Sequence, residues 1–182
     1  ALSKQGDFRK AASSGREEFT KFLERYSARD VPNLFWTTTA WAGWIAASTG
    51  SVESMADLPA LEATMERILA LDETFYHGGP HLLQAVYLAA KPNIMGGDLA
   101  RAKRHFDRAF ALGSDRLLMA KVYFAQYYAR GMKDRALYER TLRDVLAAPV
   151  DAVPELTLAN TIAREKARKL LDRTEGYFEE PL

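Results

Sequence analysis

The fold of this chain is decided by residues 96–109, which read GGDLARAKRHFDRA. The two glycines suit a turn, and Asp98 is a residue type that caps the start of a helix. Beyond it, Ala102, Phe106 and Ala109 recur at steps of four and three residues, which places them on one helical face, and basic residues occupy the opposite face. The segment therefore predicts a turn followed by an amphipathic helix.

The same spacing of apolar residues recurs along the chain, which indicates a repeat. A small, an aromatic and a second small residue at these steps are typical of the second helix of a tetratricopeptide hairpin. The four sets are Phe19, Leu23 and Tyr26; Leu61, Met65 and Ile68; Ala102, Phe106 and Ala109; and Tyr138, Leu142 and Val145. We expect about four irregular helix pairs, since each pair buries its apolar face only against its neighbours.

Other parts of the chain show helical periodicity and turn formers, and no stretch alternates with the period of two that marks a half-buried strand. Further helices are predicted over residues 7–29 with a break near 13–15, 34–48, 58–71, 80–90, 116–129, 133–147 and 155–172. We predict an all-α protein whose helical hairpins stack as degenerate tetratricopeptide-like repeats in an α-α superhelix. It is expected to form a single domain over residues 1–182, with the charged helix 155–172 as its terminal cap.

The segment 34–48 is apolar on nearly all sides. Trp36, Ala40, Trp44 and Ala47 form one stripe along it, so the helix is predicted to lie between other helices. The polar stretch 51–54 that follows is predicted to be a loop.

Composition excludes several classes of function. The formal net charge is +1, which leaves no strong field for binding nucleic acid. Cysteine is absent, so the given chain has no disulfide, thiolate metal site or cysteine nucleophile. The longest apolar segment is shorter than the ~20 residues that span a bilayer. Because the chain begins at Ala1 without a methionine, we expect a processed or trimmed product.

Three histidines fall within residues 75–109. His77 and His81 are four residues apart, the spacing of two metal ligands on one helix, but Gly78, Gly79 and Pro80 interrupt the helix between them. No third ligand is indicated, so hydrogen-bonding histidines are favoured over a metal site. The glycines and Pro80 could also expose an anion-binding helix start, although ordinary turn chemistry explains them more simply.

Two aromatic clusters, one around Trp41 and one around Tyr127, could line an apolar ligand groove or pack the core, and core packing is favoured. The chain contains no nucleophile elbow, zinc-protease, calcium-loop or P-loop motif, so no catalytic residues are predicted and no cofactor is expected. The candidate residues for binding a ligand or partner are Trp36, Trp41, Tyr76, His77, His81, Tyr87, Tyr123 and Tyr127.

Three motifs together resemble one family. They are LFWTTTAWAGWI (residues 34–45), FYHGGPH (75–81) and GGDLARAKRHFDRA (96–109). In this order and spacing they resemble the TatT family, the T component associated with TRAP (tripartite ATP-independent periplasmic) transporters.

The resemblance implies a periplasmic, non-enzymatic protein that works beside the P component, the solute-binding protein of the transporter. It further implies a lipid anchor in the full-length protein, a homotrimer, and a small hydrophobic ligand that is bound or passed on. The alternative is a generic tetratricopeptide adaptor that binds a peptide or assembles an envelope complex.

Overall fold

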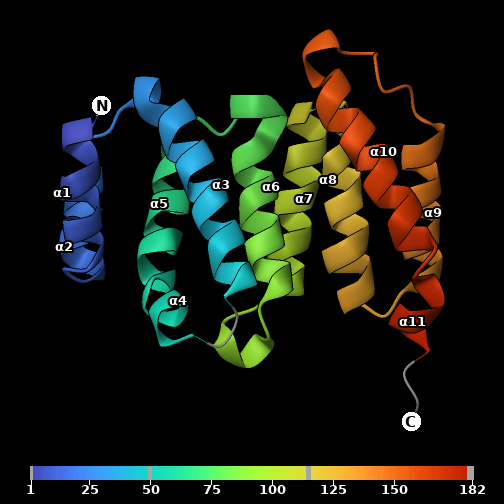
Figure 1. The fold of residues 1–182 in the computed structure, drawn as a ribbon, viewed down its shortest axis with the longest axis horizontal. Coiled ribbons are helices and arrows are strands. Elements are labelled where there is room, and N and C mark those ends of the chain that lie inside the picture. Colours follow the sequence, from blue (N-terminus) through green and yellow to red (C-terminus); the bar gives the residue numbers. More distant parts are fainter. Residues whose placement is uncertain (1, 49–50, 114–115, 180–182) are drawn as a thin grey trace. The chain divides into compact units, whose positions relative to one another are not determined.

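The computed structural model describes residues 2–48, 51–113 and 116–179, and every regular element within these ranges is a helix (Figure 1). The predicted all-α helical-repeat fold is therefore confirmed. The chain divides into two compact units, residues 1–75 and 76–182, which are described in turn.

The first unit is built around α5, which packs against both α2 and α3. Its elements are α1 (Leu2–Ala12), α2 (Arg16–Leu23), the 3₁₀ turn η1 (Ala28–Asp30), α3 (Val31–Ala47), α4 (Val52–Ala56) and α5 (Leu58–Leu71). Phe19 and Leu23 from α2 meet Ala60 and Ala63 from α5 in a buried cluster, because both helices place small and large apolar residues at three- and four-residue steps.

The predicted break near residues 13–15 is present, since α1 ends at Ala12 and α2 begins at Arg16. The predicted extension of this helix to residue 29 is wrong. Ser27 and Asp30 form a reciprocal cap in which the Ser27 backbone N–H donates to Asp30 Oδ2 at 2.9 Å. This cap starts a new turn that runs directly into α3, so α3 begins at Val31 rather than at Leu34.

The predicted loop over residues 51–54 is also wrong. The Ser51 hydroxyl accepts a hydrogen bond from the Ser54 backbone N–H at 3.0 Å and so caps the short helix α4. Polar composition indicated a loop, but serine at this position is a helix-starting residue.

Burial of α3 is less complete than its apolar composition predicts. The residues buried on α3 are Val31, Leu34, Phe35 and Thr38, all from its first half. Trp36 and Trp44, from the stripe predicted to be buried, are 49% and 46% exposed. Composition alone overestimates burial here, since an apolar residue is not obliged to be inside.

The second unit contains the rest of the helices. They are α6 (Phe75–Ala90), the 3₁₀ turn η2 (Asn93–Met95), α7 (Leu99–Gly113), α8 (Leu118–Tyr123), the π-helical segment η3 (Phe124–Ala129), α9 (Arg135–Ala147), the 3₁₀ turn η4 (Pro154–Leu156), α10 (Thr157–Leu171) and α11 (Thr174–Phe178). Helix α10 packs on both α8 and α9, and α7 contacts α8 and η3.

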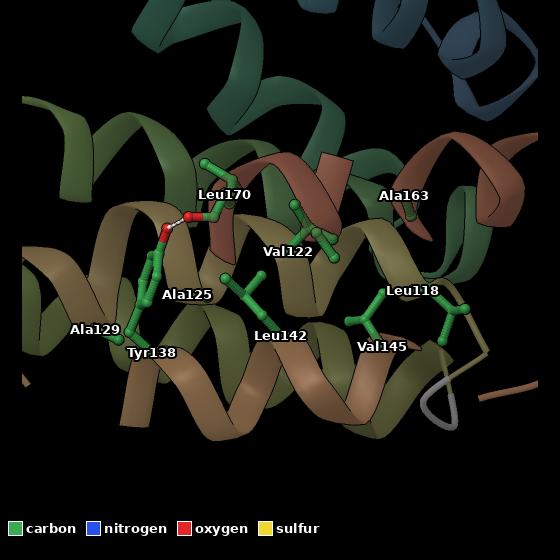
Figure 2. Close-up of a cluster of buried hydrophobic side chains, with 10 residues drawn as sticks. Leu118, Val122, Ala125, Ala129, Tyr138, Leu142, Val145, Ala163 and Leu170 are labelled. Carbon is green, nitrogen blue, oxygen red and sulfur yellow. Dashed lines mark hydrogen bonds between the residues drawn. The ribbon is translucent and has the colours of Figure 1, made fainter. Parts of the chain in front are cut away.

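The repeat faces predicted from the sequence lie in the two cores. Of the twelve residues in the four sets, all except Tyr26 are buried, with exposed fractions of 0–3%. Figure 2 shows the fourth set with its neighbours: Tyr138 and Leu142 of α9 pack in one cluster with Val122 of α8. The Tyr138 hydroxyl donates to the Leu170 backbone carbonyl of α10 at 2.9 Å, so the buried phenol has a partner.

The charged helix predicted over 155–172 is present as η4 and α10, but it is not the last helix. Helix α11 follows it and packs on α9, where the Phe178 ring lies 5.2 Å from the Tyr138 ring in an edge-to-face contact. Ala163, Ala167 and Leu170 form the buried face of α10.

Gly78 and Gly97 of the second unit both lie close to backbone atoms of other segments. Gly78 has a φ of +81°, and a Cβ atom there would lie 3.1 Å from the backbone of Ala109. A Cβ on Gly97 would lie only 1.9 Å from the Lys91 carbonyl oxygen. As predicted, Asp98 caps α7, because its Oδ1 accepts from the Arg101 backbone N–H at 2.8 Å.

Candidate functional site

The first unit contains a pocket of about 580 Å³. Its walls come from α1, from the segment between α2 and α3, from one face of α3 and from the residue that precedes α5. The lining residues are Phe8, Arg9, Ala12, Ser13, Tyr26, Asp30, Asn33, Leu34, Thr37, Thr38, Trp41 and Asp57.

Three aromatic side chains line this pocket, and Phe8 contacts the other two. The Phe8 ring lies 6.1 Å from the Trp41 ring and 6.5 Å from the Tyr26 ring, at interplanar angles of 70° and 79°. Phe8 also makes an edge-to-face contact with the buried Phe19, 5.2 Å between centroids. Edge-to-face pairs are favoured by the ring quadrupoles, so these contacts hold the aromatic wall together and tie it to the core.

A hydrogen bond joins α3 to the start of α5 at the pocket. The Trp41 Nε1–H donates to Asp57 Oδ2 at 2.8 Å. Asp57 precedes the first residue of α5, where the positive end of the helix dipole stabilises a carboxylate. The bond fixes the orientation of both the indole ring and the carboxylate.

A second carboxylate of the pocket lining, Asp30, directly precedes the first residue of α3. Asp30 Oδ2 accepts from both the backbone N–H and the hydroxyl of Ser27, at 2.9 and 3.0 Å. Burial raises the pKa of the Tyr26 phenol, and the negative charge of Asp30 raises it further. Tyr26 therefore presents a protonated hydroxyl at neutral pH.

The lining residues of α3 follow one helical face. Asn33, Thr37 and Trp41 recur every four residues, and Asp30 lies three residues before Asn33. Thr38 also lines the pocket, but its hydroxyl already donates to the Leu34 carbonyl at 2.6 Å. This helix face offers a ligand hydrogen-bonding groups beside an aromatic wall.

Only Trp41 of the eight predicted site residues lies in this pocket. The other α3 residues of the lining could have been found in the sequence, because polar residues recur there at steps of three and four within an otherwise apolar helix. Phe8 and Asp57 carry no such signal, because they reach the pocket from distant positions in the chain. Trp36 lies outside the lining, with its ring packed edge-to-face on Phe35 at 5.0 Å.

The other predicted residues belong to the second unit. Tyr76 and His77 have φ values of 46° and 57°, in the left-handed region that non-glycine residues rarely adopt. Together with Gly78 they form a turn before the regular part of α6. The His77 Nε2 atom lies 4.0 Å from Glu155 Oε1, so this ring points toward η4.

His81 pairs with His105 rather than with His77. Their Nδ1 atoms are 2.9 Å apart, so one ring donates and the other accepts. Burial, together with the positive charges of His81, Arg101 and Arg104, lowers the pKa of His105 to about 4. Among the described residues, no three His, Cys, Asp or Glu side chains are grouped as metal ligands.

The three remaining predicted residues are tyrosines. Tyr87 and Tyr123 each contact a lysine, and Tyr123 also contacts Tyr127. The Lys91 ammonium donates to the Tyr87 hydroxyl at 3.1 Å and lies 4.5 Å from its ring centroid. Tyr123 and Tyr127 are 5.9 Å apart, and the Lys166 ammonium lies 4.5 Å from the Tyr123 ring. Burial raises the pKa of both tyrosines and lowers that of Lys166.

The fold and the pocket define an all-α helical-repeat protein with a ligand-sized pocket that has aromatic side chains in its walls. No helix in the described part of the chain is long and apolar enough to cross a bilayer. The family model of the TRAP transporter T-component (TAtT) matches residues 1–178, so the chain belongs to this family. A comparison with curated proteins finds no match.

Family membership confirms the resemblance seen in the sequence. It associates the protein with a TRAP transporter and indicates an extracytoplasmic location. It also places the chain in a transporter-component family rather than in an enzyme family.

Proposed function

We propose that this protein works in the periplasm beside the solute-binding P component of a TRAP transporter, and that its pocket binds or passes a small ligand with an apolar body. The observation that carries the proposal is the pocket of the first unit, with Phe8, Tyr26 and Trp41 in its walls. Its volume of about 580 Å³ falls within the range of roughly 300–1,000 Å³ that is typical of small-molecule sites.

The exposed tryptophans of α3 support a protein partner. Trp36 and Trp44 are about half exposed and lie eight residues apart on one helical stripe, while Trp41 faces the pocket. Large exposed aromatic residues are enriched among the residues that dominate protein interfaces. A P component docked on this stripe would lie on the same helix that lines the ligand pocket.

Further parts of the proposal follow from family resemblance. We expect a homotrimer and a lipid anchor in the full-length protein. The alternative function is an adaptor that binds a peptide or assembles an envelope complex without any small ligand. The exposed tryptophans would serve such an adaptor equally, whereas its pocket would bind no small molecule.

The partner is tested by immobilising the P component encoded beside this protein and measuring binding of the purified chain. Replacing Trp36 and Trp44 by alanine should weaken binding at least tenfold, since hot-spot aromatics each contribute about 2 kcal/mol or more. Val52→Ala is the matched control, because it removes an exposed apolar side chain of the same unit that lies outside the stripe. No association with the P component would refute this part of the proposal.

The ligand site is tested with the variant W36F/W44F, in which Trp41 is the one remaining tryptophan. A small aryl alcohol should change the Trp41 fluorescence saturably, because the indole lines the pocket. Enlarging the side chain of Ala12, which also lines the pocket, to leucine should abolish the change while the helical circular dichroism is retained. An unsaturable or absent response would contradict a ligand function.

A further inference from the structure

The pocket lining contains two carboxylates and one guanidinium, and the carboxylates are the more buried. Asp30 and Asp57 are half-buried carboxylates, whereas Arg9 is an exposed guanidinium. An exposed charge is screened by water and salt more strongly than a recessed one. The recessed part of the pocket is therefore negative.

The hydrogen-bonding groups of the pocket also favour a ligand that donates hydrogen bonds over an anion, which accepts them. The indole N–H of Trp41 is already engaged by Asp57, so it offers no bond to an anion. Among the described residues, Trp41 is the one donor to the Asp57 carboxylate, and the contact uses Oδ2. Asp57 Oδ1 thus retains acceptor capacity beside the indole ring.

The aromatic rings add to this preference. Aromatic faces carry negative charge density and attract ammonium groups, and desolvated cation–π contacts contribute about 2 kcal/mol. Phe8, Tyr26 and Trp41 line the pocket together with Asp57. Aromatic rings beside a carboxylate form a site that attracts an organic cation through both its charge and its hydrocarbon.

We propose that the pocket selects a small organic cation, with a protonated amine paired to Asp57 and an apolar body against Phe8, Tyr26 and Trp41. This inference rests on the proposed ligand function and specifies its ligand class. The ammonium donates to Asp57 Oδ1 while Trp41 holds Oδ2, so a single carboxylate serves the protein and the ligand. Because Arg9 is exposed, its positive charge repels a cation bound at Asp57 less than a buried positive charge would.

Three probes of similar size separate the outcomes: 2-phenylethylamine, 2-phenylethanol and 3-phenylpropionate. Binding to the folded chain is measured by calorimetry at neutral pH and by the Trp41 fluorescence of W36F/W44F. The amine should bind about tenfold or more tightly than the alcohol, and its affinity should fall as salt is raised.

Asp57→Asn keeps an oxygen acceptor for Trp41 but removes the charge. It should weaken amine binding about tenfold and so remove most of the preference for the amine over the alcohol. Glu53→Gln is the matched control, since it removes an exposed charge from the neighbouring helix α4 outside the pocket lining and should change neither affinity.

Equal binding of the amine and the alcohol would overturn the cation inference and leave the proposed ligand function standing. Tighter binding of the carboxylate, lost in Arg9→Gln, would overturn it in favour of an anion site. If none of the three probes binds at low-millimolar concentration, both the inference and the proposed ligand function fall.

Discussion

Replacing Gly97 by alanine should destabilise the second unit strongly, because the new methyl group meets backbone on the far side of a closed turn. The added Cβ would lie 1.9 Å from the Lys91 carbonyl oxygen and 2.7 Å from its carbonyl carbon. Neither atom can move like the end of a flexible side chain, so the turn itself must open.

The magnitude follows from the hydrogen bonds that hold this turn. The Gly97 N–H donates to the Pro92 carbonyl at 3.0 Å, and the Asp98 N–H donates to the Leu88 carbonyl at 3.1 Å. Each contributes about 0.5–1.5 kcal/mol. Misplacing Asp98 also disturbs the cap of α7, which contributes about 1 kcal/mol. The expected loss of unfolding free energy is about 2–4 kcal/mol.

Urea unfolding followed by far-ultraviolet circular dichroism measures this loss. A thermal scan should show a Tm lower by roughly 5–15 °C for a chain of this size. Gly43→Ala is the control, because nothing lies within 4 Å of a Cβ at this position in α3. It should raise stability by up to about 1 kcal/mol through helix propensity. A G97A protein within about 0.5 kcal/mol of the parent, a typical surface-substitution effect, would refute the reasoning.

Three further predictions concern the second unit. Its stability should fall by about 1–2 kcal/mol as pH drops from about 6.5 to about 4, because the pKa of His105 is about 4 and the unfolded chain takes up the proton first. Solvent around the half-buried ring screens its charge and keeps the loss this small. Urea midpoints across this range should show the decline, and His105→Gln should reduce it, whereas an unchanged slope in the variant would exclude His105 as the cause. Asn160→Ala should lower stability by about 2–4 kcal/mol, since the buried amide accepts from Leu118 N–H at 3.0 Å and donates to the Arg116 carbonyl. Chemical unfolding checks this, with the exposed Thr161→Ala as control, and equal losses in the two variants would contradict it. Tyr138→Phe should lower stability by about 1 kcal/mol and Tyr138→Ala by about 3–5 kcal/mol, because the first removes only the bond to Leu170 and the second also leaves a cavity; similar losses in calorimetry would show that the ring contributes little packing.

Much of the fold was predictable because the helices of a stack bury one face at a regular period. Residues such as Leu61, Phe106 and Leu142 show this period and are buried. The short helix α4 was missed because Ser51 serves equally as a loop residue and a helix cap. The burial of α3 was overestimated because apolar composition does not show which side chains pack against other helices.

The candidate site was less predictable than the fold, since its walls come from separate parts of the chain. Phe8 meets Tyr26 and Trp41 only after α1 folds against the α2–α3 region. Asp57 shows in the sequence as a residue at a helix start, and its bond to Trp41 depends on how α3 packs beside α5. Tertiary contacts of this kind produce no periodic pattern in the sequence, so they could not be predicted from it.

The contact between Gly78 and Ala109 joins two motifs that are far apart in the sequence. A Cβ on Gly78 would lie 3.1 Å from the Ala109 backbone and 3.1 Å from the Leu112 Cβ. The backbone of the last residue of GGDLARAKRHFDRA therefore lies directly against the turn within FYHGGPH. Among relatives of this chain, the two motifs should therefore be inherited together, and transplanting either motif alone should fail where transplanting both succeeds.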